Sequence, residues 1–147
     1  MAFDTDLWMR RLKDVEREFL AARFATLDTI RRVRLEPYVL VDGVKPNDLS
    51  RSAENLEGTY TVRLFSEFET GLKAYWRTGR KSQIPSRARD FIQSVAAYRG
   101  IPSDWVTGTH SVRVYRNFLV HQRDDDIVPI PLAVSRGHLT RFLSCLR

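Results

Sequence analysis

Three side chains that could act together on a phosphate group lie within residues 115–121, which read Tyr-Arg-Asn-Phe-Leu-Val-His. An imidazole such as that of His121 exchanges protons near neutral pH, and the guanidinium of Arg116 carries fixed N–H donors that suit phosphate oxygens. The amide of Asn117 can both donate and accept hydrogen bonds. We therefore interpret this segment as a phosphate-facing part of the protein.

The helical period sorts residues 105–121 into a core face and a polar face. The positions that fall within about 80° of one another and are expected to face the core are Trp105, Val112, Tyr115 and Leu119. On the opposite side His110, Asn117 and His121 fall within about 40°, and Arg113 lies about 60° from His110. The pattern predicts that a polar stripe opposes the buried one.

Arg116 does not share this stripe, because about 140° separates it from His121 on an ideal helix. Three solutions stay open: the arginine reaches round, the helix distorts, or the arginine of one subunit serves the histidine of another. Val114 and Phe118 on one side of the stripe and Val120 on the other indicate a partly covered face. A second copy across a two-fold axis would cover it and place two His121 side chains in one cleft, so we expect a symmetric dimer.

The net charge of +6, from 24 basic and 18 acidic residues, is unevenly distributed. Two stretches without acidic residues hold the basic side chains that are candidate phosphate contacts, namely Arg77, Arg80, Lys81, Arg87 and Arg89 in the first and Arg113, Arg116 and Arg123 in the second. An ordinary solvated loop and helix face is the alternative interpretation. Charge alone does not decide between them.

The elements that would position these residues are all predicted to be helices. Apolar periodicity and breaker residues indicate helices over 2–36, from about 48 to 79, from a Ser86 cap to Gly100, from 102 to 121 or 122, and from a Ser135 cap onward. Residues 41–43 and 46–47 are expected to form turns. Apart from the brief 126–128 segment there is no alternation of period two, so residues 1–147 are predicted to form a single all-α domain, a bundle of four or five helices.

The composition argues against several classes of protein and several kinds of site. No apolar run approaches the length of a membrane span, and the N-terminus is acidic, so we expect a cytoplasmic protein that is neither secreted nor membrane-bound. The single Cys145 excludes an internal disulfide, and three scattered histidines have no metal-binding spacing. We expect no metal and no cofactor.

Residues 116–121 match the arginine, polar residue, spacer and histidine signature of the HEPN superfamily, which the chain resembles. Residues 65–69, with Leu72, Tyr75 and Trp76, are also similar to that family. The resemblance implies a helical, commonly dimeric bundle and a metal-independent RNA endonuclease of toxin, defence or stress systems. It implies that His121 is the catalytic histidine, Arg116 the phosphate ligand and Asn117 the orienting residue, with 2′-hydroxyl attack leaving a 2′,3′-cyclic phosphate.

The resemblance also has consequences beyond the motif. It implies that Glu67 or Glu69, which point to different flanks of their helix, could orient Arg116 or His121; ordinary salt bridges are the alternative. An antitoxin or another regulatory protein is a possible partner. Many toxin-type members carry a modified tyrosine two residues after the histidine, where this chain has Arg123, so that form of regulation is not expected.

Other functions stay open at this point. His121 could simply interact with the C-terminal end of its helix, and a noncatalytic HEPN-like dimer that binds RNA or a protein partner is the main alternative. A helical DNA-binding regulator is supported by positive charge alone, since the sequence has no clear helix-turn-helix with a recognition helix.

Overall fold

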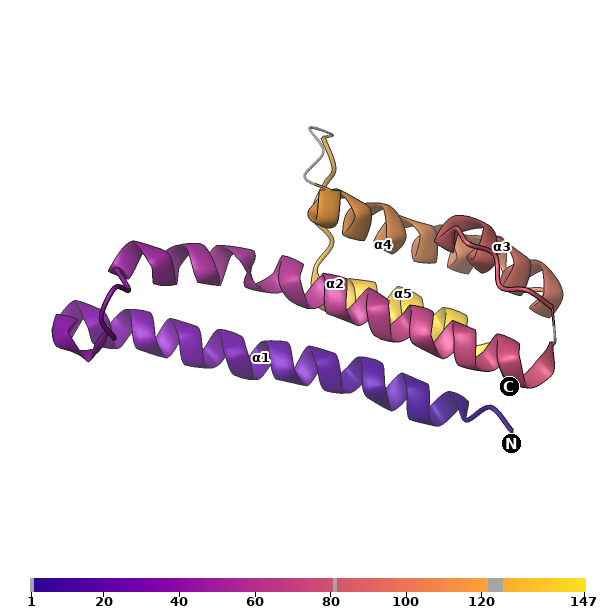
Figure 1. The fold of residues 1–147 in the computed structure, drawn as a ribbon, viewed down its shortest axis with the longest axis horizontal. Helices are drawn as coiled ribbons and strands as arrows, with labels where there is room; N and C mark the ends of the chain where they lie inside the picture. Colours follow the sequence, from indigo (N-terminus) through magenta and orange to yellow (C-terminus); the bar gives the residue numbers. More distant parts are fainter. Residues whose placement is uncertain (1, 81, 122–125) are drawn as a thin grey trace.

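The computed structural model describes residues 2–80, 82–121 and 126–147 (Figure 1). In order, the helices are α1 (Thr5–Leu35), the short 3-10 helix η1 (Pro37–Val39), α2 (Pro46–Gly79), α3 (Ala88–Arg99), α4 (Ser103–His121) and α5 (Leu132–Ser144). These described ranges contain no strand, so the all-α prediction with five helices is confirmed. None of the described helices is long and apolar enough to cross a membrane.

A long antiparallel hairpin of α1 and α2 is the base on which the other helices pack. Helix α5 contacts α1, α2 and α4, while α4 lies on α2 and α5, and α3 packs mainly on α4. Figure 1 shows that α4 and α5 run along only one half of the hairpin, so the end that holds residues 36–45 projects beyond them. Any site on α4 therefore lies over the covered half of α2.

One apolar cluster holds the covered half together, and every α-helix contributes to it. Leu12, Leu64, Val95, Val112 and Leu139 are fully inaccessible to solvent. Along α2 the apolar residues at a spacing of four are buried from position 64 to position 76, whereas those at positions 56 and 60 are only partly buried. Residues 57 and 58 contact α5 and α4, so these two helices cover α2 only from about position 57 onward.

Two of the predicted helix starts are wrong. Pro46, expected in a turn, is the first residue of α2, a position where its missing N–H costs no helical hydrogen bond. Helix α3 begins at Ala88 after Arg87, so Ser86 is not its cap. At the other end of α3, Gly100 adopts the left-handed conformation expected of it, with φ of 61°.

Helix α5 also begins four residues earlier than a Ser135 cap predicts, and another helix supplies its cap. Ser135, the predicted cap, lies fully buried inside the first turn. The carboxylate of Glu57 in α2 instead accepts a hydrogen bond from the backbone N–H of Leu132, at 2.7 Å. A carboxylate at a helix N-terminus also interacts favourably with the helix dipole, so Glu57 ties α5 to α2.

Close approach of α4 and α5 depends on Gly108. A Cβ atom at this position would lie well inside van der Waals contact with Nδ1 of His138 and 2.9 Å from its Cε1. By contrast, a Cβ at Gly137 in α5 would meet no atom within 4 Å. Gly108 and Gly137 therefore provide a matched pair for mutation, because an added methyl group would be crowded at the first position and unobstructed at the second.

We predict that Gly108→Ala lowers the free energy of unfolding by about 1 kcal/mol, because overpacking of about 1–3 kcal/mol exceeds the helix-propensity gain of about 1 kcal/mol. Urea unfolding would measure the change, with Gly137→Ala as the control expected to stabilise slightly. In a His138→Ala background, the Gly108→Ala penalty should vanish. An equal penalty in both backgrounds would show that the His138 ring is not its cause.

Candidate active site

Helix α4 has a buried inner face and an exposed outer face, and the candidate residue His121 lies on the exposed face. On its inner side Val112 and Tyr115 are buried, while Leu119 is half-buried over Gly58 of α2. On its outer side His121 is exposed, and Val114 and Val120 are each more than two-fifths exposed. The buried and exposed faces therefore follow the helical period, with apolar residues flanking the outer stripe.

Arg116 is fixed in orientation by residues from two helices. One of its terminal nitrogens donates to Oδ1 of Asn117 at 2.9 Å, and the other donates to Oε2 of Glu69 in α2 at 3.0 Å. Its guanidinium carbon lies 5.0 Å from the centre of the Phe65 ring, a cation–π distance. These two hydrogen bonds use two of the five N–H donors of the guanidinium, which leaves three that could meet a phosphate.

The two candidate acids have different partners, as their positions on either side of Phe68 require. Glu69 is the carboxylate that contacts Arg116. Glu67 instead lies 3.9 Å from Arg11 of α1. Of the two, only Glu69 is placed to orient the candidate phosphate ligand.

His121 lies at the last residue of α4, apart from Arg116. The Arg116 side chain is directed across to α2, and no hydrogen bond among the described residues joins it to the His121 imidazole. The arginine therefore does not reach round the helix toward the histidine. Within one copy of the chain, α4 does not bring the two groups together.

His110 belongs to a second polar group, in which the sequence predicted the proximity of Arg113 but not the contact with Gln93. Nε of Arg113 donates to Nδ1 of His110 at 3.2 Å, and the side-chain amide of Gln93 in α3 lies 3.0 Å from Nε2. Burial, Arg113 and Arg89 lower the pKa of His110 below its ordinary value of 6.5. A neutral ring that accepts at Nδ1 carries its proton on Nε2, so the Gln93 amide, whose nitrogen is placed toward Nε2, must be turned over for its oxygen to accept there.

The basic residues predicted to contact phosphate do not form one surface. Arg113 and Arg116 lie one turn apart on α4, but Arg77 and Arg80 lie at the far end of α2. Leu119, two residues before His121, packs on Gly58. Arg77 and Arg80 therefore lie about 30 Å from His121, measured along α2. Arg80 lies over the rings of Tyr98 and Trp76, at 4.2 and 5.2 Å from their centres. Lys81 and Arg123 lie outside the described residues.

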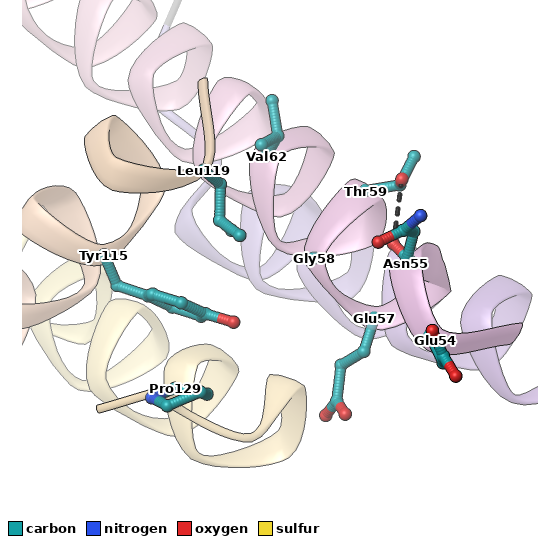
Figure 2. Close-up of a pocket in the computed structure, with 9 residues that line it drawn as sticks. All are labelled: Glu54, Asn55, Glu57, Gly58, Thr59, Val62, Tyr115, Leu119 and Pro129. Carbon is teal, nitrogen blue, oxygen red and sulfur yellow. Dashed lines mark hydrogen bonds between the residues drawn. The ribbon is translucent and has the colours of Figure 1, made fainter. Parts of the chain in front are cut away.

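A polar hollow of about 480 Å³ lies on the inner side of α4 (Figure 2). It is lined by Glu54, Asn55, Glu57, Gly58, Thr59, Val62, Tyr115, Leu119 and Pro129. Figure 2 shows the Tyr115 hydroxyl and the Glu57 carboxylate on the same side of α2, and both burial and Glu57 raise the pKa of Tyr115. With two carboxylates and no basic side chain in its lining, this hollow does not suit a phosphate.

Comparisons of the chain with protein-family models, curated proteins and solved structures find no match. Within the described part of the chain, no group of three His, Cys, Asp or Glu side chains could hold a metal ion. The functional argument therefore depends on the residues of α4 and their contacts. The sequence pattern did not predict that Gln93 and Phe65 support side chains of α4, because these roles depend on contacts between helices that no local pattern indicates.

The lowered pKa of His110 predicts a specific pH dependence of stability. Between its folded-state pKa and 6.5, the unfolded chain binds the His110 proton and the folded chain does not, so stability must fall as pH falls through this window. We expect urea unfolding to show a larger loss between pH 7.5 and pH 5.5 in the wild type than in His110→Asn, which keeps an acceptor for Arg113 but does not titrate. Equal losses in the two proteins would contradict the assignment.

Proposed function

We propose that this chain is a metal-independent RNA endonuclease of the HEPN type that acts as a symmetric dimer in a toxin, defence or stress system. The observation that carries the proposal is the orientation of Arg116 by Glu69, Asn117 and Phe65, which leaves three guanidinium donors for a phosphate. The five-helix architecture and the exposed His121 on the same helix support it.

In this mechanism the substrate provides its own nucleophile. His121 accepts the proton of a ribose 2′-hydroxyl, whose oxygen attacks the neighbouring phosphorus while the bond to the 5′-oxygen breaks. The leaving 5′-oxygen takes up a proton, so the products are a 2′,3′-cyclic phosphate and a 5′-hydroxyl. Arg116 stabilises the negative charge on the phosphate oxygens, and Asn117 holds its guanidinium in place.

A dimer could bring together the arginine and the histidine that a single α4 keeps apart. Since Arg116 is directed toward α2 and His121 is exposed at the helix end, the arginine of one protomer and the histidine of its partner are the pair that a shared cleft could combine. Val114 and Val120, exposed on either side of the polar stripe, offer apolar surface for such a contact. The two-fold axis would give the dimer two equivalent sites, each with the Arg116 of one protomer and the His121 of the other.

The first test concerns the chemistry. We predict that the protein cleaves RNA in the presence of EDTA and that His121→Ala reduces the rate at least about 100-fold, the usual contribution of a general acid or base. Denaturing gels and detection of the cyclic phosphate would measure this, with the exposed Arg34→Ala on α1 as the control. Cleavage that EDTA abolishes, or that His121→Ala leaves unchanged, would refute the mechanism.

The second test asks whether Arg116 and His121 act across the dimer. Arg116→Ala and His121→Ala are each expected to be inactive alone, but mixing and re-annealing them should restore about one quarter of wild-type activity, because half of the dimers are then mixed and each holds one intact site. If both residues act within one protomer, the mixture should stay inactive. Light scattering at micromolar concentration would verify that dimers form.

The alternative is a noncatalytic dimer of the same type that binds RNA or a regulatory protein. The observation that favours it is the ion pair between Arg116 and Glu69, which partly neutralises the candidate phosphate ligand. Binding of RNA without cleavage, equal in the wild type and His121→Ala, would support this alternative.

A further inference from the structure

Arg113 is held in place by a chain of hydrogen bonds that begins on another helix. Gln93 of α3 contacts His110, and His110 accepts from Nε of Arg113. Because this bond uses the inner nitrogen of the guanidinium, it fixes the direction of the side chain and leaves the two terminal nitrogens to other partners.

Arg113 lies among other positive charges. Burial and the charges of Arg89 and Arg116 lower the pKa of Arg113, although its guanidinium stays protonated. Among the described residues no carboxylate is within ion-pair distance of Arg113, whereas Arg116 has Glu69. A bound anion would relieve this repulsion.

The start of α3 adds to the positive potential at this place. Arg89 lies in its first turn, four residues before Gln93 and so on the face of α3 that meets His110. The capping residue Arg87 makes no side-chain hydrogen bond to the helix end. The first-turn N–H groups and the helix dipole therefore favour an anion. Asp90 is adjacent in sequence, but among the described residues it forms no ion pair with either Arg89 or Arg113.

We propose that Arg113 and Arg89 form a second phosphate subsite beside Arg116, and that His110, supported by Gln93, is a positioning residue that acts through Arg113. The ligand is the phosphodiester that neighbours the one bound by Arg116 on an RNA strand. This inference deepens the proposed function and rests on it for the identity of the ligand. It requires a substrate that extends at least one nucleotide beyond the cleaved bond.

Binding of a 2′-O-methyl RNA strand, which lacks the attacking hydroxyl, tests the subsite apart from cleavage. Fluorescence anisotropy over a range of salt concentrations should show about tenfold weaker affinity for Arg113→Ala. The slope of log affinity against log salt should also fall by about 0.7, the value for one lost contact to a single strand. Arg34→Ala, which removes the same charge from an exposed position on α1, should leave the slope nearly unchanged.

A double-mutant cycle tests the positioning role of His110. We expect His110→Ala to weaken binding and the double variant with Arg113→Ala to bind no more weakly than Arg113→Ala alone. His110→Asn should restore most of the affinity, because its amide oxygen can replace Nδ1 as the acceptor. Thermal unfolding of each variant identifies any that has lost its fold, and His110→Asn keeps the test decisive if His110→Ala does not fold.

Two results would overturn the inference: independent, multiplicative effects of His110→Ala and Arg113→Ala, or a salt slope for Arg113→Ala equal to that of Arg34→Ala. Either can occur while RNA cleavage still depends on His121, in which case the proposed function survives. Conversely, coupled binding effects in a protein that cleaves no RNA would leave the subsite intact and refute the nuclease.

Discussion

Burial of one face of α4 is the constraint on which the candidate site depends. Val112 and Tyr115 must lie in the core, and this fixes the rotation of the helix about its axis. The same rotation directs Arg116 toward α2 and leaves His121 exposed at the helix end. Packing, rather than the local chemistry of the motif, therefore separates these two side chains within a protomer.

The two arginines of α4 are supported in different ways. Arg116 has a carboxylate partner and an aromatic ring, so its charge is partly compensated before any ligand binds. Arg113 has a neutral imidazole as its acceptor, which gives direction without adding negative charge. A surface that orients both but neutralises only one retains a net attraction for anions.

Much of the fold could be predicted from the sequence because its signals are local. The apolar period and the breakers gave α1, α2 and α4 to within a few residues, and the helical wheel separated Tyr115 from His121. The cap of α5 could not be predicted, since Glu57 and Leu132 are 75 positions apart.

The same limitation applies to the site. The partnership of Gln93 with His110 and the choice of Glu69 over Glu67 depend on how separate helices pack. A helical period gives the direction of a side chain from its own axis, but not the neighbour it meets. Tertiary packing supplies that information.

The position of α5 has a consequence for how the protein is made. This helix fills the space between α1, α2 and α4, and Thr5 at the start of α1 donates a hydrogen bond to the carbonyl of Leu146. During synthesis, the apolar surfaces of α1, α2 and α4 that α5 covers stay exposed until residues 132–144 have left the ribosome. A chain released before that point would keep the packing of α4 on α2 but lack the packing on α5 that completes its orientation.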